Sequence, residues 1–188
     1  MNILKFLFSL AFLWISVVPA AFANPAQTVE IENAELANMF SEDQAIRDEI
    51  SKRGGWTNVK DDKAFLTRWH TEDAARLDRT QRLLEAGALK SGLDFYRAAF
   101  IFQHGKRPED YLKAHHLAVI AISKGYDARW ISAATLDRYL QATDKKQIYG
   151  TQSRANEAGD YVREPVELGI VSDAERAELN VPALTDEE

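Results

Sequence analysis

The sequence predicts an all-α fold, a single-domain bundle of about five main helices with an irregular C-terminal segment. Apolar residues recur at helical spacing over most of the chain between residues 33 and 152. Residues that favour helix starts alternate there with glycines that favour helix ends. We expect one domain over residues 24–188, with its core at about residues 33–152 and an irregular tail at residues 153–188, because about 165 residues suit a single domain.

The stretch 94–152 holds the densest apolar helices. Ser91, with Asp94 three residues later, has the pattern of a capping box at a helix start. The run that follows, residues 95–102, is apolar on nearly every face. We therefore expect this helix to be central in the bundle.

Two polar residues, Gln103 and His104, end that central helix before Gly105, which we expect to form a left-handed C-terminal cap. Buried polar side chains need hydrogen-bonding partners. A single histidine in an apolar context is more often a hydrogen-bonded core residue than a catalyst, so both interpretations of His104 stay open.

Adjacent histidines occur on the next helix, which we expect to start at Pro108 and to end at Gly125. His115 and His116 point about 100° apart around a helix. We therefore expect them to differ in exposure and not to bind one metal ion together.

A third helix is expected to begin near Asp127, a good N-cap residue. It carries Asp137 on a stripe that is otherwise apolar and that includes Trp130 and Leu140. Arg138 lies one step further round the helix. This helix therefore presents an acid and a base at or beside its packed side.

Polar residues also interrupt the apolar faces of the first two expected helices. Asp43, Gln44 and Arg47 do so on the first helix, and Asp73 does so on the second. Two alternatives stay open for the first helix: these side chains face a pocket, or Asp43 and Arg47 form a surface pair at i,i+4 spacing.

The first of these helices is expected to begin at Asn33, a good N-cap residue, and the second at the Asp61-Asp62 pair. Gly54-Gly55 should end the first one, with a loop at residues 56–60 before the second. We place His70 on the surface of the second helix.

The segment 147–152 mixes β-type and turn residues, and Gly150 permits a tight backbone path there. We expect this segment either to fold back over a cleft or to form an ordinary ordered turn. Residues 153–167 are polar and loosely patterned, and Ser172 with Glu175 predicts one short helix.

Residues 1–23 have the pattern of a cleavable secretory signal, with Lys5, an apolar run over residues 6–18 and small residues before Asn24. A retained membrane anchor is the alternative, but the apolar run is shorter than the roughly 20 residues that a spanning helix needs. We therefore predict export, a periplasmic or secreted location, and no stable membrane insertion after the signal is removed.

Charge and composition exclude several kinds of partner and site. Removing the signal deletes Lys5 and no acidic residue, which leaves 22 basic and 29 acidic residues and a net charge of −7. Nucleic acid and anionic membrane surfaces are poor partners for such a chain. Because the sequence contains no cysteine, disulfides, thiolate metal sites, cysteine nucleophiles and lipid attachment through cysteine are excluded.

Four short motifs form a set: Asp43-Gln44-x-x-Arg47, Gln103-His104, Asp137-Arg138 and Gln147-x-Tyr149-Gly150-Thr151-Gln152. The set resembles the signature of a bacterial family known only as a domain of unknown function, over roughly residues 35–152. The resemblance implies a mainly helical protein and carries no particular activity. This chain departs from a QHAD-like form of many relatives at Gly105-Lys106.

The sequence lacks the nucleophile elbow, the zinc-protease motif, the phosphate loop and the dinucleotide fingerprint, and it identifies no cofactor. No pair of candidate ligands has the spacing of a helical metal site, so we expect no metal. Polar residues nevertheless interrupt four expected helices. Burying that many is costly unless they converge on one another or on a ligand.

We therefore expect a polar pocket, walled by Trp69, Phe100, Trp130 and Tyr149, that recognises a small polar or anionic molecule. In the enzymatic version of this hypothesis the pocket also hydrolyses that molecule. The candidate catalytic residues are His104 as acid/base, with Asp137 or Asp73 to orient it. The candidate ligand-binding residues are Asp43, Gln44, Arg47, Gln103, Arg138, Tyr149 and Gln152. The alternative is a non-enzymatic scaffold or a protein with a protein partner, in which the same residues form a structural network.

Overall fold

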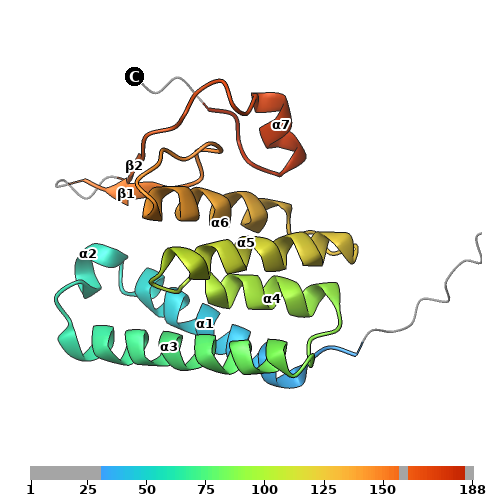
Figure 1. Cartoon of the computed structure of the whole chain (residues 1–188). Helices are drawn as coiled ribbons and strands as arrows, with labels where there is room; N and C mark the ends of the chain where they lie inside the picture. The colour runs from blue at the N-terminus through green and yellow to red at the C-terminus, as the bar shows by residue number, and fades with distance from the viewer. Residues whose placement is uncertain (1–30, 157–160, 185–188) are drawn as a thin grey trace, which may run out of the picture.

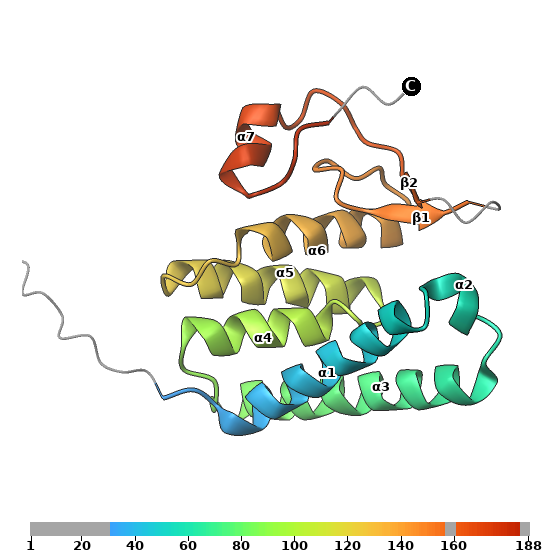
Figure 2. The same cartoon turned by 180° about the vertical axis from the view of Figure 1, so that it is seen from behind.

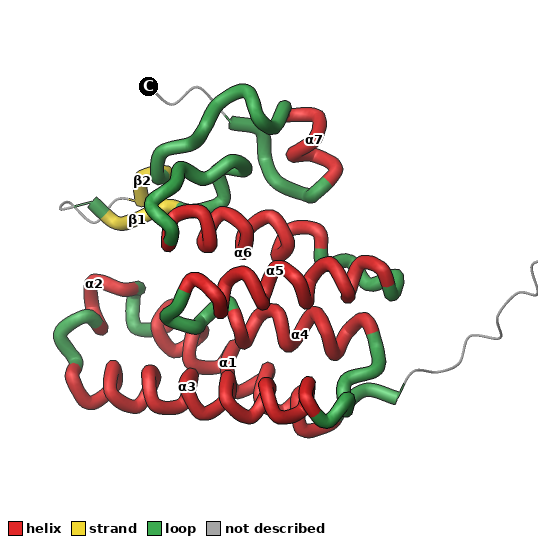
Figure 3. Tube along the Cα trace, in the orientation of Figure 1, coloured by secondary structure: helices red, strands yellow, loops and turns green. Residues whose placement is uncertain are grey.

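A computed structural model of the chain describes residues 31–156 and 161–184. The predicted signal at residues 1–23 lies outside the described residues. The described elements are α1 (Ala34–Lys52), α2 (Trp56–Val59), α3 (Lys63–Glu85), α4 (Gly92–Phe102), α5 (Pro108–Ser123), α6 (Arg129–Ala142), β1 (Ser153–Ala155), β2 (Tyr161–Arg163) and α7 (Asp173–Glu178). The fold is all-α, as the sequence predicts, and Figure 3 shows how little of it is strand.

The helices stack in layers, with α4 in the middle of the bundle (Figure 1). α4 packs against α1 and α3 on one side and against α5 on the other, and α5 in turn packs against α6. The segment that follows α6 covers the outer side of α6 (Figures 1 and 2). The prediction that α4 is central is confirmed.

The main hydrophobic core gathers side chains from every layer of the bundle. Its buried residues include Leu36 of α1, Ile101 and Phe102 of α4, Leu117 of α5 and Ile131 of α6. A smaller cluster joins α1, α2 and α3 at one end. Among the described residues, no helix is both long enough and apolar enough to cross a bilayer.

Local capping signals fix most helix starts. Ser91 and Asp94 form a capping box, and the side chains of Asn33 and Asp62 cap α1 and α3. Ser172 forms the expected box with Glu175 at the start of α7. Each is confirmed because a cap involves only residues within one turn.

α6 begins close to the expected start near Asp127, with Ala128 as its N-cap. Two local expectations are wrong. Within the expected loop at residues 56–60, residues 56–59 form a short helix, α2. Trp130 is 42% exposed and does not face the core, which α6 fills instead with Ile131 and neighbouring small residues.

Gly105 also differs from its expected role, since it does not have the positive φ of a left-handed cap. A Cβ at Gly105 would lie 2.3 Å from the Cβ of Asp110. Glycine is therefore required here by the close approach of the backbone to Asp110, which lets the turn between α4 and α5 stay tight.

The predicted irregular tail contains a two-stranded antiparallel sheet, in which Ser153 pairs with Arg163 and Ala155 with Tyr161. Gln147 forms an isolated parallel bridge to Val166 and is fully buried. The side-chain amide of Gln147 donates to the carbonyl oxygens of Gln152 and Glu164, at 3.0 and 2.6 Å. The tail is therefore tied to the segment that follows α6.

Candidate functional site

Polar and charged side chains from four segments gather around the C-terminal end of α4. We call this set the polar cluster, and its members are Asp43 and Arg47 of α1, Asp73 and Arg76 of α3, His104 after α4, and Arg138 of α6. The helices that carry these residues are far apart in sequence, so only the packing of the layers brings them together (Figure 1).

Arg47 links the two carboxylates of the polar cluster. Its guanidinium donates two hydrogen bonds to Asp73, at 2.9 and 2.8 Å, and lies 3.0 Å from Oδ1 of Asp43. It also sits over the ring of Trp69, 5.5 Å from the centroid. The expected pairing of Asp43 with Arg47 is present, but it is part of a buried cluster and not a solvated helix surface.

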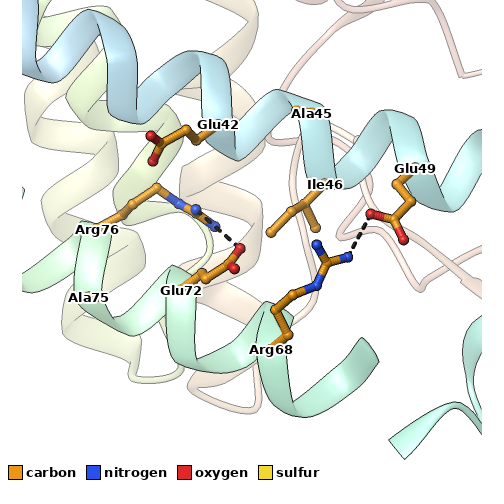
Figure 4. A pocket seen from close by; sticks show the side chains of 8 residues that line it. All are labelled: Glu42, Ala45, Ile46, Glu49, Arg68, Glu72, Ala75 and Arg76. Atoms are coloured by element: carbon orange, nitrogen blue, oxygen red, sulfur yellow. Dashed lines mark hydrogen bonds and ion pairs between the residues drawn. The ribbon is translucent and has the colours of Figure 1, made fainter. Parts of the chain in front are cut away.

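Arg76 belongs to the polar cluster and also lines a groove between α1 and α3. Its Nη2 donates to Asp73 at 2.6 Å, and its Nη1 lies 3.8 Å from Glu72. The groove has a volume of about 480 Å³ and runs between α1 and α3. Figure 4 shows Arg76 beside Glu72 there, and Arg68 reaching across to Glu49.

Burial changes the charges of the polar cluster. Burial raises the pKa of Asp43 to about 6, against the opposing effect of Arg47. Burial acts in the same direction on Asp73, but hydrogen bonds from Arg47 and Arg76 outweigh it and lower the pKa of that carboxyl group. Both carboxyl groups are therefore mainly ionised at neutral pH.

His104 is neutral at that pH. Burial, reinforced by the charge of Arg47, lowers the pKa of His104 to about 3. Its Nε2 lies 3.6 Å from Oδ2 of Asp43, which is beyond hydrogen-bonding distance. That carboxylate oxygen accepts a hydrogen bond from Gln44 at 2.9 Å.

Arg138 has no acidic partner among the residues that the structure describes, although the nearby Tyr111 favours its charged form. Its guanidinium makes no hydrogen bond or ion pair there, and its Nε is buried. Burial lowers the pKa of Arg138, and the charge of Arg138 in turn acts on His104. Three guanidinium groups thus face two carboxylates in the polar cluster, which leaves a net positive charge.

A cavity of about 330 Å³ opens between α3 and the turn that joins α4 to α5, and we call it the His104 cavity. It is lined by His70, Asp73, Ala74, Leu77, His104, Gly105, Lys106, Arg107 and Asp110. His104 and Asp73 belong to both the cavity and the polar cluster. The cavity is therefore a route from solvent to the buried charges.

Asp137 serves a different part of the molecule from the expected one. Its carboxylate accepts hydrogen bonds from the backbone N–H groups of Ile148, Tyr149 and Thr151, at 2.8 to 3.0 Å, and from the hydroxyl of Thr151 at 2.8 Å. The expectation that Asp137 orients His104 is therefore corrected: the carboxylate beside His104 is Asp43.

Gln152 and Tyr149, which were expected to bind a ligand, have structural contacts like those of Asp137. The amide of Gln152 donates to the carbonyl oxygen of Ala134, at 3.3 Å, and the carbonyl oxygen of Tyr149 accepts from Arg176 at 3.1 Å. Gln152 and Tyr149 thus hold the segment after α6 in place. Of the two expectations for residues 147–152, a fold over a cleft and an ordered turn, the ordered turn matches these contacts.

The expected aromatic walls do not surround one pocket. Trp69 contacts the polar cluster through Arg47, whereas Phe100 and Trp130 line a separate cavity of about 210 Å³. Gln103 is buried beside His104, and its side chain makes no hydrogen bond with a described residue.

The histidines of α5 lie away from the polar cluster. His115 is partly buried, and its Nδ1 lies 2.8 Å from the carbonyl oxygen of Ser132. His116 is exposed, so the predicted difference between the two is confirmed. The described residues contain no group of three or more His, Asp or Glu side chains placed to hold a metal ion.

Sequence reasoning gave no clear role to Arg76 or Lys106, and it placed His70 on the surface, where it is exposed. Arg76 follows Asp73 at i,i+3 spacing, which is a recognisable signal for a pair on one helix. Lys106 and His70 had no signal, because the turn between α4 and α5 must first fold against α3 to bring them to one cavity.

The resemblance to a bacterial family rests on residues that the fold divides between the polar cluster and the turn at 147–152. It stays a prediction. A scan against protein-family models, a search of curated proteins and a search of solved structures each return no match for this chain.

Proposed function

We propose that the polar cluster binds a small anionic molecule. The observation that carries this proposal is Arg138, a largely buried guanidinium without an acidic partner in the described part of the chain. An unpaired buried charge is costly, and arginine is well suited to bind carboxylate or phosphate groups through two parallel hydrogen bonds. An anion would supply the missing partner.

Other unused donors of the polar cluster support the same proposal. The Nε atoms of Arg47 and Arg76 are buried and have no hydrogen-bond partner. Neither ring nitrogen of His104 makes a hydrogen bond with a described residue. Binding sites commonly retain such donors because a ligand completes their hydrogen bonding.

If the bound anion is also a substrate, Asp43 is better suited than His104 to act as the general acid or base. A pKa near the working pH favours proton transfer, and the pKa of Asp43 is about 6 whereas that of His104 is about 3. An anion next to His104 would raise the pKa of that ring, because a negative neighbour favours its charged form.

A scaffold role is the second candidate, and one contact favours it. The two hydrogen bonds from Arg47 to Asp73 join α1 to α3 with the geometry of a structural ion pair. In this role the polar cluster would fix the register of the two helices and bind nothing. The partnerless Arg138 is the reason to prefer the first candidate.

Export is also part of the proposal, with the signal-like residues 1–23 as its only support. An exported protein would meet small anions of the periplasm or of the medium. The choice between binding and scaffold roles does not depend on this point.

The direct test is calorimetric titration of the purified protein with inorganic phosphate, sulfate and acetate, for the wild type and for Arg138→Gln. We expect at least one anion to bind, and we expect Arg138→Gln to weaken it about tenfold or more, since hydrogen bonds to a charged group contribute about 1.5 to 3 kcal/mol. The matched control is Arg129→Gln on the same helix, where Arg129 already pairs with Asp127 in solvent. Binding that is equally strong in both variants would contradict the proposal.

A further inference from the structure

Two carboxylates line the His104 cavity, and both already accept several hydrogen bonds. The carboxylate of Asp73 accepts from Arg47 and Arg76. The carboxylate of Asp110 accepts from the backbone N–H groups of Lys106 and Arg107 and from the guanidinium of Arg107. Neither acid therefore has much capacity left for a ligand.

Three other nitrogen-bearing side chains that line the same cavity, unlike Arg107, have unused nitrogen atoms. The ammonium group of Lys106 makes no hydrogen bond or ion pair with a described residue, and neither ring nitrogen of His70 makes a hydrogen bond with one. His104, at the inner wall, is also without a hydrogen bond, as described above. The groups available to a ligand are thus donors or cations.

The charged groups around His104, at the inner wall, also favour an anion. Arg47, Arg76 and Arg138 all act electrostatically on His104. They are opposed by Asp73 and by Asp43, whose carboxylate lies 3.6 Å from Nε2 of His104. Three guanidinium groups against two carboxylates leave a net positive charge at the inner end of the cavity. Its side wall is different, because Ala74 and Leu77 of α3 present carbon atoms.

We infer that the His104 cavity holds an organic anion, with its charged head against His104 and Lys106, His70 at the rim, and an apolar body against Ala74 and Leu77. This inference rests on the proposed anion binding and assigns His70 and Lys106 to the site. A volume of about 330 Å³ is at the lower end of the range for small-molecule sites, so the apolar body must be short.

The test compares hexanoate with acetate, which differ only in the apolar body, and with hexanamide, which lacks the charge. Binding of carboxylates should tighten by up to about fourfold for each methylene until the cavity is full, as expected for burial of apolar surface. Hexanamide should not bind measurably. Hexyl phosphate serves to distinguish a site that prefers phosphate heads from one that prefers carboxylates.

Two variants locate the ligand. Ala74→Phe fills the cavity from the exposed side of α3, and it should weaken hexanoate while leaving inorganic phosphate or acetate unchanged. Lys106→Met should weaken all of the anions by about twofold to fivefold, whereas the control Lys60→Met, at an exposed position away from the cavity, should not. If Ala74→Phe fails to fold, the chain-length series and Lys106→Met still decide.

The outcomes separate the two proposals. If small anions bind in an Arg138-dependent way but chain length, Ala74→Phe and Lys106→Met have no effect, this inference is overturned and the proposed function stands. If no anion binds at all, both are overturned. Tight binding of hexanamide would show an apolar site without charge recognition and would also overturn the inference.

Discussion

Two buried arginines of this protein are in opposite situations. Arg138 has no partner among the described residues, whereas Arg176 donates to the carbonyl oxygens of Tyr149, Ile148 and Val171 at 2.8 to 3.1 Å. Binding sites retain unpaired groups at a cost in stability, and structural networks do not.

Replacing each arginine with methionine should therefore have opposite effects on stability. Arg138→Met should raise the free energy of unfolding by about 1 to 4 kcal/mol, because an apolar side chain replaces an uncompensated charge. Arg176→Met should lower it by about 3 to 5 kcal/mol, because buried carbonyl groups lose their donor. Urea unfolding of both variants measures the difference. A marked loss of stability in Arg138→Met would favour the scaffold role.

The pKa shifts of Asp43 and His104 predict how the stability of the fold depends on pH. The pKa of His104 is about 3 in the fold against an ordinary 6.5, so the unfolded chain binds the proton first and stability falls as the pH drops below about 6.5. The pKa of Asp43 is about 6 in the fold against an ordinary 3.8, so the folded chain binds that proton first. Stability therefore rises as the pH falls from about 6 to about 4. The two effects oppose each other between pH 4 and 6.

Single substitutions should separate these effects. His104→Gln removes the loss of stability that protonation of His104 causes. The stability of this variant should therefore rise relative to the wild type on acidification from pH 6.5 to 4, by up to about 1.4 kcal/mol per pH unit. Asp43→Asn removes the compensation and should lose stability more steeply than the wild type between pH 6 and 4. Urea unfolding across this pH range provides the measurement. Parallel profiles for all three proteins would contradict the electrostatic description of the cluster.

At the scale of elements, the turn at residues 147–152 is held by one carboxylate. Asp137 accepts three backbone hydrogen bonds and one hydroxyl hydrogen bond from this turn. Because β1, β2 and α7 follow the turn, the position of the whole C-terminal segment on α6 depends on it.

Asp137→Ala should therefore loosen that segment before the rest of the bundle. We expect a loss of about 2 to 4 kcal/mol in local stability, since several charge-assisted hydrogen bonds are removed together. Hydrogen exchange should accelerate at residues 147–152 and change little in α4. Uniform acceleration in both regions would mean that Asp137 supports the global fold instead.

The turn between α4 and α5 depends on Gly105 in a comparable way. Gly105→Ala places a Cβ in contact with Asp110, so the turn must shift and the hydrogen bonds from Lys106 and Arg107 to Asp110 must lengthen. We expect a loss of about 1 to 3 kcal/mol, typical of overpacking, together with weaker anion binding. Melting and titration of this variant measure both effects. A variant with unchanged stability and binding would show that the turn has room to adapt.

For the molecule as a whole, the open prediction is export. Cleavage before Asn24 would leave a chain with a net charge of −7. Intact-mass measurement on the protein recovered outside the cytoplasm checks the cleavage position. Recovery of a species that retains residues 1–23 would reject the cleavable signal and return attention to a membrane anchor.

The sequence by itself determined the fold class and most helix boundaries, because these depend on short-range interactions. Ser91 and Asp94 meet within one turn, and the apolar run after them can only be satisfied at the centre of a bundle. The sequence also marked Asp43 and Arg47 as polar residues on apolar faces, and both lie in the polar cluster.

Only the tertiary structure decided which acid meets which base. Asp43, Asp73 and Asp137 interrupt their helices in the same way, but packing brings Asp43 to His104 and Asp137 to the turn at 147–152. Helical spacing predicts the face of the helix on which a side chain lies, but not the residue of another helix that the side chain contacts. The strand pair within residues 153–163 likewise depends on contacts between segments that have no strong pattern of their own. Such long-range choices depend on how the layers stack, and this is why the composition of the candidate site could not be derived from the sequence.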